Sequence, residues 1–327
     1  MNNFFTTKRT PAPDQIMIGS GAGKFTKNEK GIIVNGKIAI KEPARTRVII
    51  ALIAVYLSWG STYLAIKIAL TELPPLFMMG IRFFVFGIGF YAYLRLRGAP
   101  NPGRGEWLRS AIIGTFLMLG GSAGVAYAEQ WVDSGLAALV IATTPLWTVL
   151  FAGIWKRWPN RLEWAGLLIG LVGIVVLNFE GDLRASPLGA VLLVLAATSW
   201  AFGSAWSQNL KLPKGMMAGA AQMITGGAVV LLVSALWGER IVEMPSWKPV
   251  AAVLYLGIFG SLVGFTAYTY LLSRVRPALA TSYAYVNPVI AVTLGITFAG
   301  ERISMIGVIA MAIIIVGVVL VAFGQRK

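Results

Sequence analysis

The chain has 327 residues, of which 57% are hydrophobic and only 13% are charged, and its formal net charge is +15. Soluble domains carry about 25% charged residues, so this composition excludes an ordinary soluble protein and indicates a helical membrane protein. Histidine and cysteine are both absent, which removes disulfides, histidine general bases and the usual zinc or haem sites. We therefore expect no cofactor and no metal. The basic residues lie in short loops, so we do not expect a nucleic-acid partner.

Residues 1–46 form a polar segment rich in Gly, Lys, Thr and Asn. This segment has no long apolar run, so we expect a disordered cytoplasmic tail and assign it no function. It also lacks the short apolar core and cleavage site of a secretory signal peptide. We therefore expect the first membrane helix to be an uncleaved anchor.

Ten apolar segments follow, each long enough to cross a bilayer as a helix. Short connections separate them, and several carry proline at the start of the next helix, where its missing N–H has no helical partner. The approximate limits of the segments are 47–70, 75–97, 108–128, 133–155, 161–179, 187–209, 215–236, 249–273, 277–299 and 304–323. The sequence therefore predicts an all-α membrane protein with ten transmembrane helices.

The distribution of the 28 lysines and arginines predicts how these helices are oriented. Basic residues next to a membrane segment resist translocation, so the more basic loops face the cytoplasm. Twenty-two of them lie in the N-terminal tail, in the loops after helices 2, 4, 6 and 8, or at the C terminus, and four lie in the other loops. Both termini are therefore expected in the cytoplasm. The remaining two, Lys67 and Arg82, lie inside helices.

The two halves of the chain repeat a common pattern at an offset of about 141–143 residues. Ser58-Trp59 corresponds to Ser199-Trp200, and Pro145 corresponds to Pro288. Each repeat contains five helices, an odd number, so the second repeat must enter the membrane from the opposite side. We expect inverted-topology repeats over residues 47–182 and 183–327, an arrangement that is common in secondary transporters.

Proline interrupts two of the predicted membrane helices near their midpoints, at Pro145 and Pro288. Proline removes a helical hydrogen bond, so both residues are candidate kinks with a gating role, and a purely structural kink is the alternative. Around Pro288, Tyr285 lies on one face of the helix, whereas Tyr283 and Asn287 lie nearly opposite. The sequence leaves open which face lines a cavity. We take Tyr285 and Asn287 as candidate lining residues, with interhelical hydrogen bonding as the alternative.

Arg82 is the most unusual residue of the predicted membrane region. A cation at that depth is costly and usually faces a cavity. It could bind a substrate carboxylate through two hydrogen bonds, or it could pair with Glu72 or with carbonyls at a helix end. Aromatic and polar residues of other helices add to the candidates. The candidate substrate-binding residues are Trp59, Tyr63, Arg82, Thr144, Trp147, Trp200, Gln222, Tyr268, Tyr285 and Asn287.

Three stretches, Trp59–Tyr63, Pro74-Pro75 with Gly80–Phe83, and Thr281–Pro288, resemble motifs of a known transporter family. They are similar to those of the drug/metabolite transporter superfamily, in particular its bacterial EamA-type ten-helix exporters. The resemblance covers roughly residues 47–323 and implies two EamA domains. It also implies export of metabolites or amino acids by alternating access from a cavity between the halves, in the cell inner membrane.

The predicted function is therefore a secondary exporter of an amino acid, an aromatic metabolite or a drug-like compound. Its partners would be this small molecule and the lipid bilayer, and a homodimer is a candidate assembly. The alternatives are a channel, a non-transporting sensor and, least favoured, a membrane-embedded enzyme. Nucleotide-binding motifs are absent, so we do not expect an ATP-driven pump. Coupling to protons could use Glu129 or Glu72 near the outer face, or transport could be facilitative.

Overall fold

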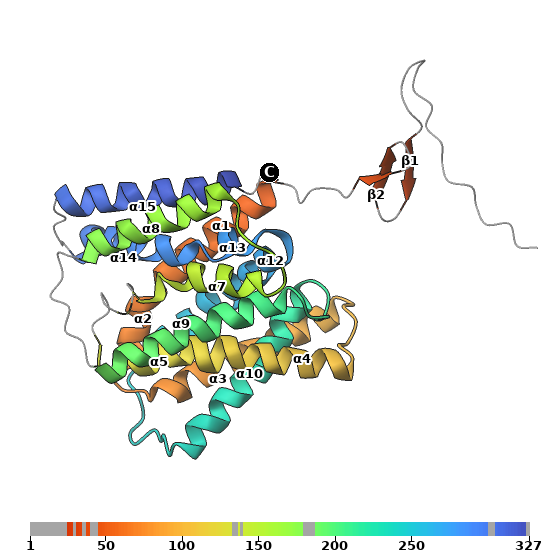
Figure 1. Cartoon of the computed structure of the whole chain (residues 1–327). Helices are drawn as coiled ribbons and strands as arrows, with labels where there is room; N and C mark the ends of the chain where they lie inside the picture. Colours follow the sequence, from red (N-terminus) through yellow and green to blue (C-terminus); the bar gives the residue numbers. More distant parts are fainter. Residues whose placement is uncertain are drawn as a thin grey trace, which may run out of the picture. The chain divides into compact units, whose positions relative to one another are not determined.

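The computed structural model describes residues 25–28, 31–34, 37–39, 45–132, 137, 140–178, 187–299 and 305–324. The chain divides into two units, Met1–Ile49 and Ile50–Lys327, each of which is described by itself (Figure 1). The first unit holds three short strands and the start of the first helix. All the other helices belong to the second unit.

The strands of the first unit form an antiparallel sheet in the order β1-β2-β3. They are β1 (Phe25–Asn28), β2 (Gly31–Val34) and β3 (Lys37–Ala39). The register pairs Phe25 with Val34, and Val34 with Lys37. A disordered tail is expected here from the composition, and the strands differ from that expectation. In the sequence between β2 and β3, Asn35-Gly36 is a residue pair that favours two-residue hairpin turns.

Helix is present in every one of the ten segments that the sequence analysis expects to span a membrane. The elements are α1 (Arg45–Gly60), α2 (Thr62–Ala69), α3 (Pro75–Leu96), α4 (Arg104–Gly114), η1 (Thr115–Ala123), α5 (Gly124–Ala128), α7 (Thr144–Gly153), α8 (Arg161–Asn178), α9 (Pro187–Ser207), α10 (Met216–Leu236), α11 (Trp247–Tyr255), η2 (Leu256–Phe265), α12 (Thr266–Arg274), α13 (Pro277–Ala280), α14 (Tyr283–Ala299) and α15 (Met305–Gly324). Within the described chain, seven helical stretches are long and apolar enough to cross a membrane. The all-α membrane class is confirmed, while the count of ten crossings and the cytoplasmic termini stay predictions.

Two long helical stretches each contain a π-helical section, in which the backbone turns are wider than in an α-helix. These sections are η1 and η2, and their first residues, Thr115 and Leu256, lie 141 positions apart. That spacing falls within the repeat offset found in the sequence. π-Helical turns are rare and occur frequently at functional sites, and residues of both sections line a cavity.

The break in the ninth predicted segment lies at Thr281-Ser282, between α13 and α14, and not at Pro288. The hydroxyl of Thr281 donates to the carbonyl of Pro277 (2.9 Å), and that of Ser282 donates to the carbonyl of Leu279 (2.8 Å). These bonds satisfy backbone groups at a place where hydrocarbon offers no water. Pro288 lies inside α14, so the break precedes this proline, and the kink and gating role predicted for Pro288 stay predictions.

The break in the fourth predicted segment likewise precedes its proline, and the gating role of Pro145 stays a prediction. A turn at residues 142–143 precedes α7, and Pro145 lies in the first turn of that helix. Proline is well tolerated there because its missing N–H has no helical partner. The hydroxyl of Thr143 donates to the carbonyl of Val140 (2.6 Å). In both segments a hydroxyl side chain upstream of the proline therefore bonds a carbonyl at the break.

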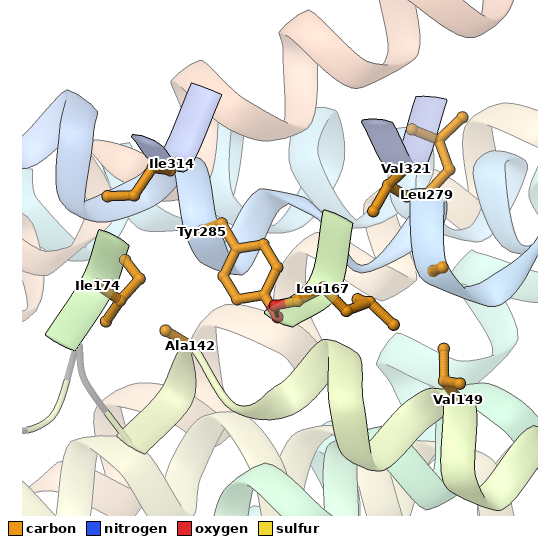
Figure 2. Close-up of a cluster of buried hydrophobic side chains, with 9 residues drawn as sticks. Ala142, Val149, Leu167, Ile174, Leu279, Tyr285, Ile314 and Val321 are labelled. Carbon is orange, nitrogen blue, oxygen red and sulfur yellow. Dashed lines mark hydrogen bonds between the residues drawn. The ribbon is translucent and has the colours of Figure 1, made fainter. Parts of the chain in front are cut away.

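A buried cluster of apolar side chains holds together α7, α8, α13, α14 and α15 (Figure 2). Tyr285 lies at its centre in the figure, with side chains such as Leu167 and Ile314 around it. Helices α8 and α15 run side by side (Figure 1), and their backbones approach closely at glycines. A Cβ atom at Gly166 would lie 2.6 Å from the carbonyl oxygen of Gly317, so a side chain at either glycine would separate the two helices.

Helices α3 and α10 approach each other in the same way. A Cβ atom at Gly227 of α10 would lie 2.5 Å from the backbone nitrogen of Phe84, and one at Gly80 of α3 would lie 2.8 Å from the side chain of Leu231. Small residues at membrane helix interfaces allow this close packing. The two pairs, α3 with α10 and α8 with α15, each join helices at corresponding places in the two predicted repeats.

Candidate functional site

A cavity of about 100 Å³ lies among α1, α2, α3, η1, α5, α7, α9, η2 and α14. Its lining includes five of the ten residues predicted to bind substrate. These five are Trp59, Arg82, Thr144, Trp200 and Asn287. Most of the remaining wall is apolar. In such a site the few polar groups determine the orientation of the ligand and the specificity.

Arg82 is the cation of this cavity and is only 5% exposed. One terminal nitrogen donates a long hydrogen bond to the hydroxyl of Ser122 (3.4 Å), and the guanidinium lies 4.4 Å from the centre of the Phe83 ring. Its Nε and Nη1 have no hydrogen-bond partner among the described residues. A buried charged donor without partners is unfavourable, so this side chain is suited to an anionic ligand.

The alternative pairing of Arg82 with Glu72 is absent from the structure. The carboxylate of Glu72 instead accepts hydrogen bonds from the backbone N–H of Ser246 (2.6 Å) and from its hydroxyl (2.7 Å). These bonds, above all the one from the backbone, hold the pKa of the Glu72 carboxyl below its usual value. Glu72 therefore caps the start of α11.

Asn287 is the second polar group of the cavity with unused hydrogen-bonding capacity. It is 2% exposed, and its Oδ1 has no partner among the described residues. Tyr283, one turn earlier on α14, also lines the cavity. The face of α14 that lines the cavity is therefore the one with Tyr283 and Asn287, and not the one with Tyr285.

Four aromatic side chains at the cavity, which we call the aromatic cluster, pack mainly edge-to-face or tilted against one another. They are Trp59, Trp200, Tyr268 and Tyr283, with ring centroids 4.5–5.5 Å apart in the contacting pairs. The Tyr268 hydroxyl bonds Ser204 (2.5 Å) and accepts from the Trp200 indole N–H (3.1 Å). Tyr268 is fully buried behind the other rings, so it supports the cavity wall without lining it, unlike the prediction.

Glycines in the two π-helical sections make room for the indoles of this cluster. A Cβ atom at Gly121 of η1 would lie 2.6 Å from the Trp200 ring, and one at Gly264 of η2 would lie 2.4 Å from the Trp59 indole nitrogen. The indole N–H of Trp59 donates to the carbonyl of Gly260 (2.9 Å). The sequence analysis left Gly121, Ser122 and Gly260 out of its candidates, although the run Gly120-Gly121-Ser122 was the available signal.

Three other predicted residues lie outside the cavity, and one cannot be placed. Tyr285 is fully buried in the apolar cluster of Figure 2, where its hydroxyl donates to the carbonyl of Leu167 (3.0 Å). Trp147 donates to its neighbour Thr143 (3.1 Å). Gln222 is buried on α10, whose backbone packs tightly against α4. The side chain of Tyr63, on α2, is outside the described part of the chain.

A second, larger cavity of about 710 Å³ lies at the adjacent ends of α2, α3, α5 and α10. Its lining includes Glu72 and Glu239, and we call it the vestibule. The Glu239 carboxylate accepts from the backbone N–H groups of Leu76 (3.2 Å) and Phe77 (2.8 Å) and from the Ser234 hydroxyl (2.8 Å). It therefore caps α3, as Glu72 caps α11, and each cap links one sequence half to the other.

Comparison with known proteins shows which protein family and which relatives the chain resembles. The EamA-like transporter family matches the chain twice, over residues 46–179 and 187–323. The chain is 46% identical over 276 residues to the Escherichia coli K12 protein named "Uncharacterized inner membrane transporter YedA", covering 84% of this chain and 90% of that protein. It is 25% identical over 292 residues to "Uncharacterized transporter YoaV" of Bacillus subtilis, covering 86% of this chain and 99% of that protein.

A solved structure supports the fold alone. A protein described only as "Crystal structure of protein" superimposes with a TM-score of 0.73 at 22% identity. The match covers 86% of this chain and 99% of that one. The arrangement of helices described above is thus shared with an experimentally determined structure.

Proposed function

Because the chain belongs to the EamA-like transporter family, we propose that it is a secondary transporter that exports a small metabolite by alternating access. The family and the names of its relatives point to a transporter and not to an enzyme. The protein is a multi-pass protein of the inner membrane, as its apolar helices and its E. coli relative indicate. The proposal adds the direction, the mechanism and the substrate class.

The observation that carries the substrate class is the guanidinium of Arg82, of which only Nη2 has a partner among the described residues, the Ser122 hydroxyl. Its Nε and Nη1 are buried at the cavity without partners in the described chain, and a carboxylate can accept from Nη1 together with the adjoining Nη2. The Oδ1 of Asn287 supplies an acceptor for an ammonium or hydroxyl group of the same ligand. The indoles of Trp59 and Trp200 offer an apolar wall for its body. We therefore favour amino acids and related aromatic or apolar acids.

The size of the cavity favours a compact substrate. Its volume of about 100 Å³ is below the roughly 300–1,000 Å³ that is usual for sites that hold drug-sized ligands. A bulky drug-like compound would require the walls to separate widely. A metabolite with few heavy atoms needs a smaller rearrangement.

The proposed motion follows from ten membrane helices in two inverted repeats, with both termini in the cytoplasm. Two features support this arrangement: the family matches each half of the chain once, and η1 and η2 begin 141 residues apart. Inverted repeats provide two related conformations, one open to each side of the membrane. In this proposed orientation, which the charges of the loops support, the vestibule with Glu72 and Glu239 faces the outer side.

Flux measurements with purified protein in liposomes test the transport proposal. The probes are radiolabelled leucine, phenylalanine and threonine, together with an organic cation. The expected result is saturable amino-acid flux that is stimulated by unlabelled substrate on the opposite side. Flux that rises without saturation would indicate a channel, and no flux of any probe would contradict the exporter.

Substitution of Arg82 tests the substrate class. Arg82→Gln removes the charge, so amino-acid flux is expected to fall at least about tenfold, since a hydrogen bond to a charged group contributes about 1.5–3 kcal/mol. Arg95→Gln is the matched control, because Arg95 lies on the same helix but is exposed and donates to the nearby carbonyl of Ala99. Unchanged flux in a folded Arg82→Gln protein would remove Arg82 from the site.

A further inference from the structure

The acidic residues of the described chain differ in whether their carboxylate oxygens accept hydrogen bonds. Four of them accept hydrogen bonds that cap helix starts, and one, Glu243, is exposed. The four are Glu72, Glu106, Glu163 and Glu239. Glu129 is the exception, because it is partly buried and its Oε1 is enclosed without a hydrogen-bond partner in this part of the chain. A buried polar atom without a partner calls for a functional explanation.

Glu129 is a close neighbour of residues that line each of the two cavities. It follows α5 directly, one residue beyond the membrane-spanning stretch Arg104–Ala128. Val125, one helical turn earlier on the same face, lines the central cavity, whereas Tyr127 and Gln130 line the vestibule. The neighbouring helix α2 passes between the same cavities, with Ile66 at the central cavity and Leu70 at the vestibule.

One charged side chain acts directly on Glu129, namely Lys67 of α2. Of the elements packed against α5, α3 contributes Arg82, whose guanidinium is directed to Ser122 of η1, while η1 and α9 carry no titratable side chain. The adjoining vestibule is lined by four more charged residues, Glu72, Glu239, Arg240 and Glu243. Asp133 lies outside the described residues.

We propose that Glu129 is a proton-binding site that couples export to the proton gradient across the inner membrane. The inference rests on the proposed transport function. A proton from the outer solution reaches the vestibule and binds the Glu129 carboxylate, which becomes a neutral carboxylic acid. After the cavity changes its orientation, the proton leaves on the cytoplasmic side, and the metabolite moves in the opposite direction. No oxidation or bond cleavage in the substrate is involved.

The surroundings of Glu129 suit reversible protonation near neutral pH. Burial raises the pKa of the Glu129 carboxyl to about 7, although the positive charge of Lys67 acts in the opposite direction. Glu72 has the opposite environment, since its hydrogen bonds to Ser246 hold its pKa below the usual value. The structure therefore distinguishes Glu129 from Glu72, although the sequence offers both equally as candidates for proton coupling. A proton carrier must release and bind its proton within the working pH range, and Glu129 meets this condition.

The proton site is tested directly by infrared titration of the full chain in lipid. The C=O stretching band of a protonated carboxylic acid is expected to appear as pH is lowered through about 7. It should be absent in Glu129→Gln and retained in the matched controls Glu72→Gln and Asp133→Asn. Loss of the band in Asp133→Asn, or its retention in Glu129→Gln, would overturn the assignment.

Coupling is tested in liposomes with the amino-acid probe that gives the largest flux. A pH difference of one unit, acidic outside, is expected to support about a tenfold substrate ratio at one proton per substrate. Glu129→Gln should lose this accumulation while keeping substrate exchange without a gradient, a combination that general misfolding would not produce. A wild-type protein driven by sodium and indifferent to pH would overturn proton coupling. If no probe moves but the Glu129 band still titrates, the transport proposal fails and the proton site stands.

Discussion

Tyr285 and Asn287 lie two residues apart on α14, but their surroundings are opposite. The Tyr285 hydroxyl donates to the carbonyl of Leu167, and its ring lies among apolar side chains of α8 and α15 (Figure 2). Asn287 lines the central cavity, and its Oδ1 has no partner among the described residues. Both side chains are almost fully buried, so burial alone does not distinguish packing from binding. The state of the hydrogen-bonding group distinguishes them only together with contact to the cavity, since Gln222 also has a buried Oε1 without a partner in the described chain but lies outside the cavity.

The same distinction applies to the charged residues. Glu72 and Glu239 are satisfied as helix caps, whereas Arg82 and Glu129 have buried atoms without partners in the described chain. A satisfied polar group contributes to folding, and an unsatisfied one gives up stability that a ligand or a proton can restore. This comparison predicts different consequences for substitutions on the two faces of α14 and in the two kinds of acid.

The largest effect is expected for Tyr285→Ala. Removing a buried aromatic ring from a packed core destabilises proteins by about 3–5 kcal/mol, so this variant should lose most of its folded fraction in a detergent unfolding titration. Tyr93→Ala is the matched control, because Tyr93 is an exposed tyrosine of α3 and should change little. Normal stability of Tyr285→Ala would show that the apolar cluster does not hold α8, α14 and α15 together.

A smaller effect, confined to transport, is expected for Asn287→Ala. The loss of one hydrogen bond to substrate is worth about 1 kcal/mol, so amino-acid flux should fall about fivefold while stability is unchanged or slightly higher. Flux and the unfolding midpoint are measured on the same preparation. A loss of stability without a change in flux would reverse the roles that we assign to the two faces.

The smallest effect is expected for Glu72→Gln, and it depends on pH. The pKa of Glu72 is held below its usual value by its bonds to Ser246, so the carboxylate stabilises the folded chain above its ordinary pKa. That contribution disappears as pH falls through the lowered pKa. The variant should therefore melt below the wild type at pH 7, and the difference should vanish in acid. Glu243→Gln, at an exposed acid, serves as control, and an equal shift there would remove the special role of the cap.

The membrane class and most of the helical segments could be predicted from the sequence because apolar runs and loop charges are local signals. The family could be predicted because motifs such as Trp59–Tyr63 are local too. The contact of Tyr285 with Leu167 could not, because its partner lies 118 residues away in the chain. The positions of the breaks in the fourth and ninth segments could not be read from Pro145 and Pro288 alone. Both breaks precede the proline, where the hydroxyls of Thr143 and Ser282 donate to backbone carbonyls.

The cavity and the apolar cluster can be compared directly because the chain contains no cysteine. Single cysteines are introduced as Asn287→Cys, at the cavity, and as Ala278→Cys, at a small buried residue of the apolar cluster, and are treated with a small hydrophilic thiol reagent in intact membranes. Our account predicts rapid labelling at position 287, slowed by the transported amino acid, and labelling at position 278 only after denaturation. Rapid, substrate-protected labelling at position 278 with none at position 287 would contradict it.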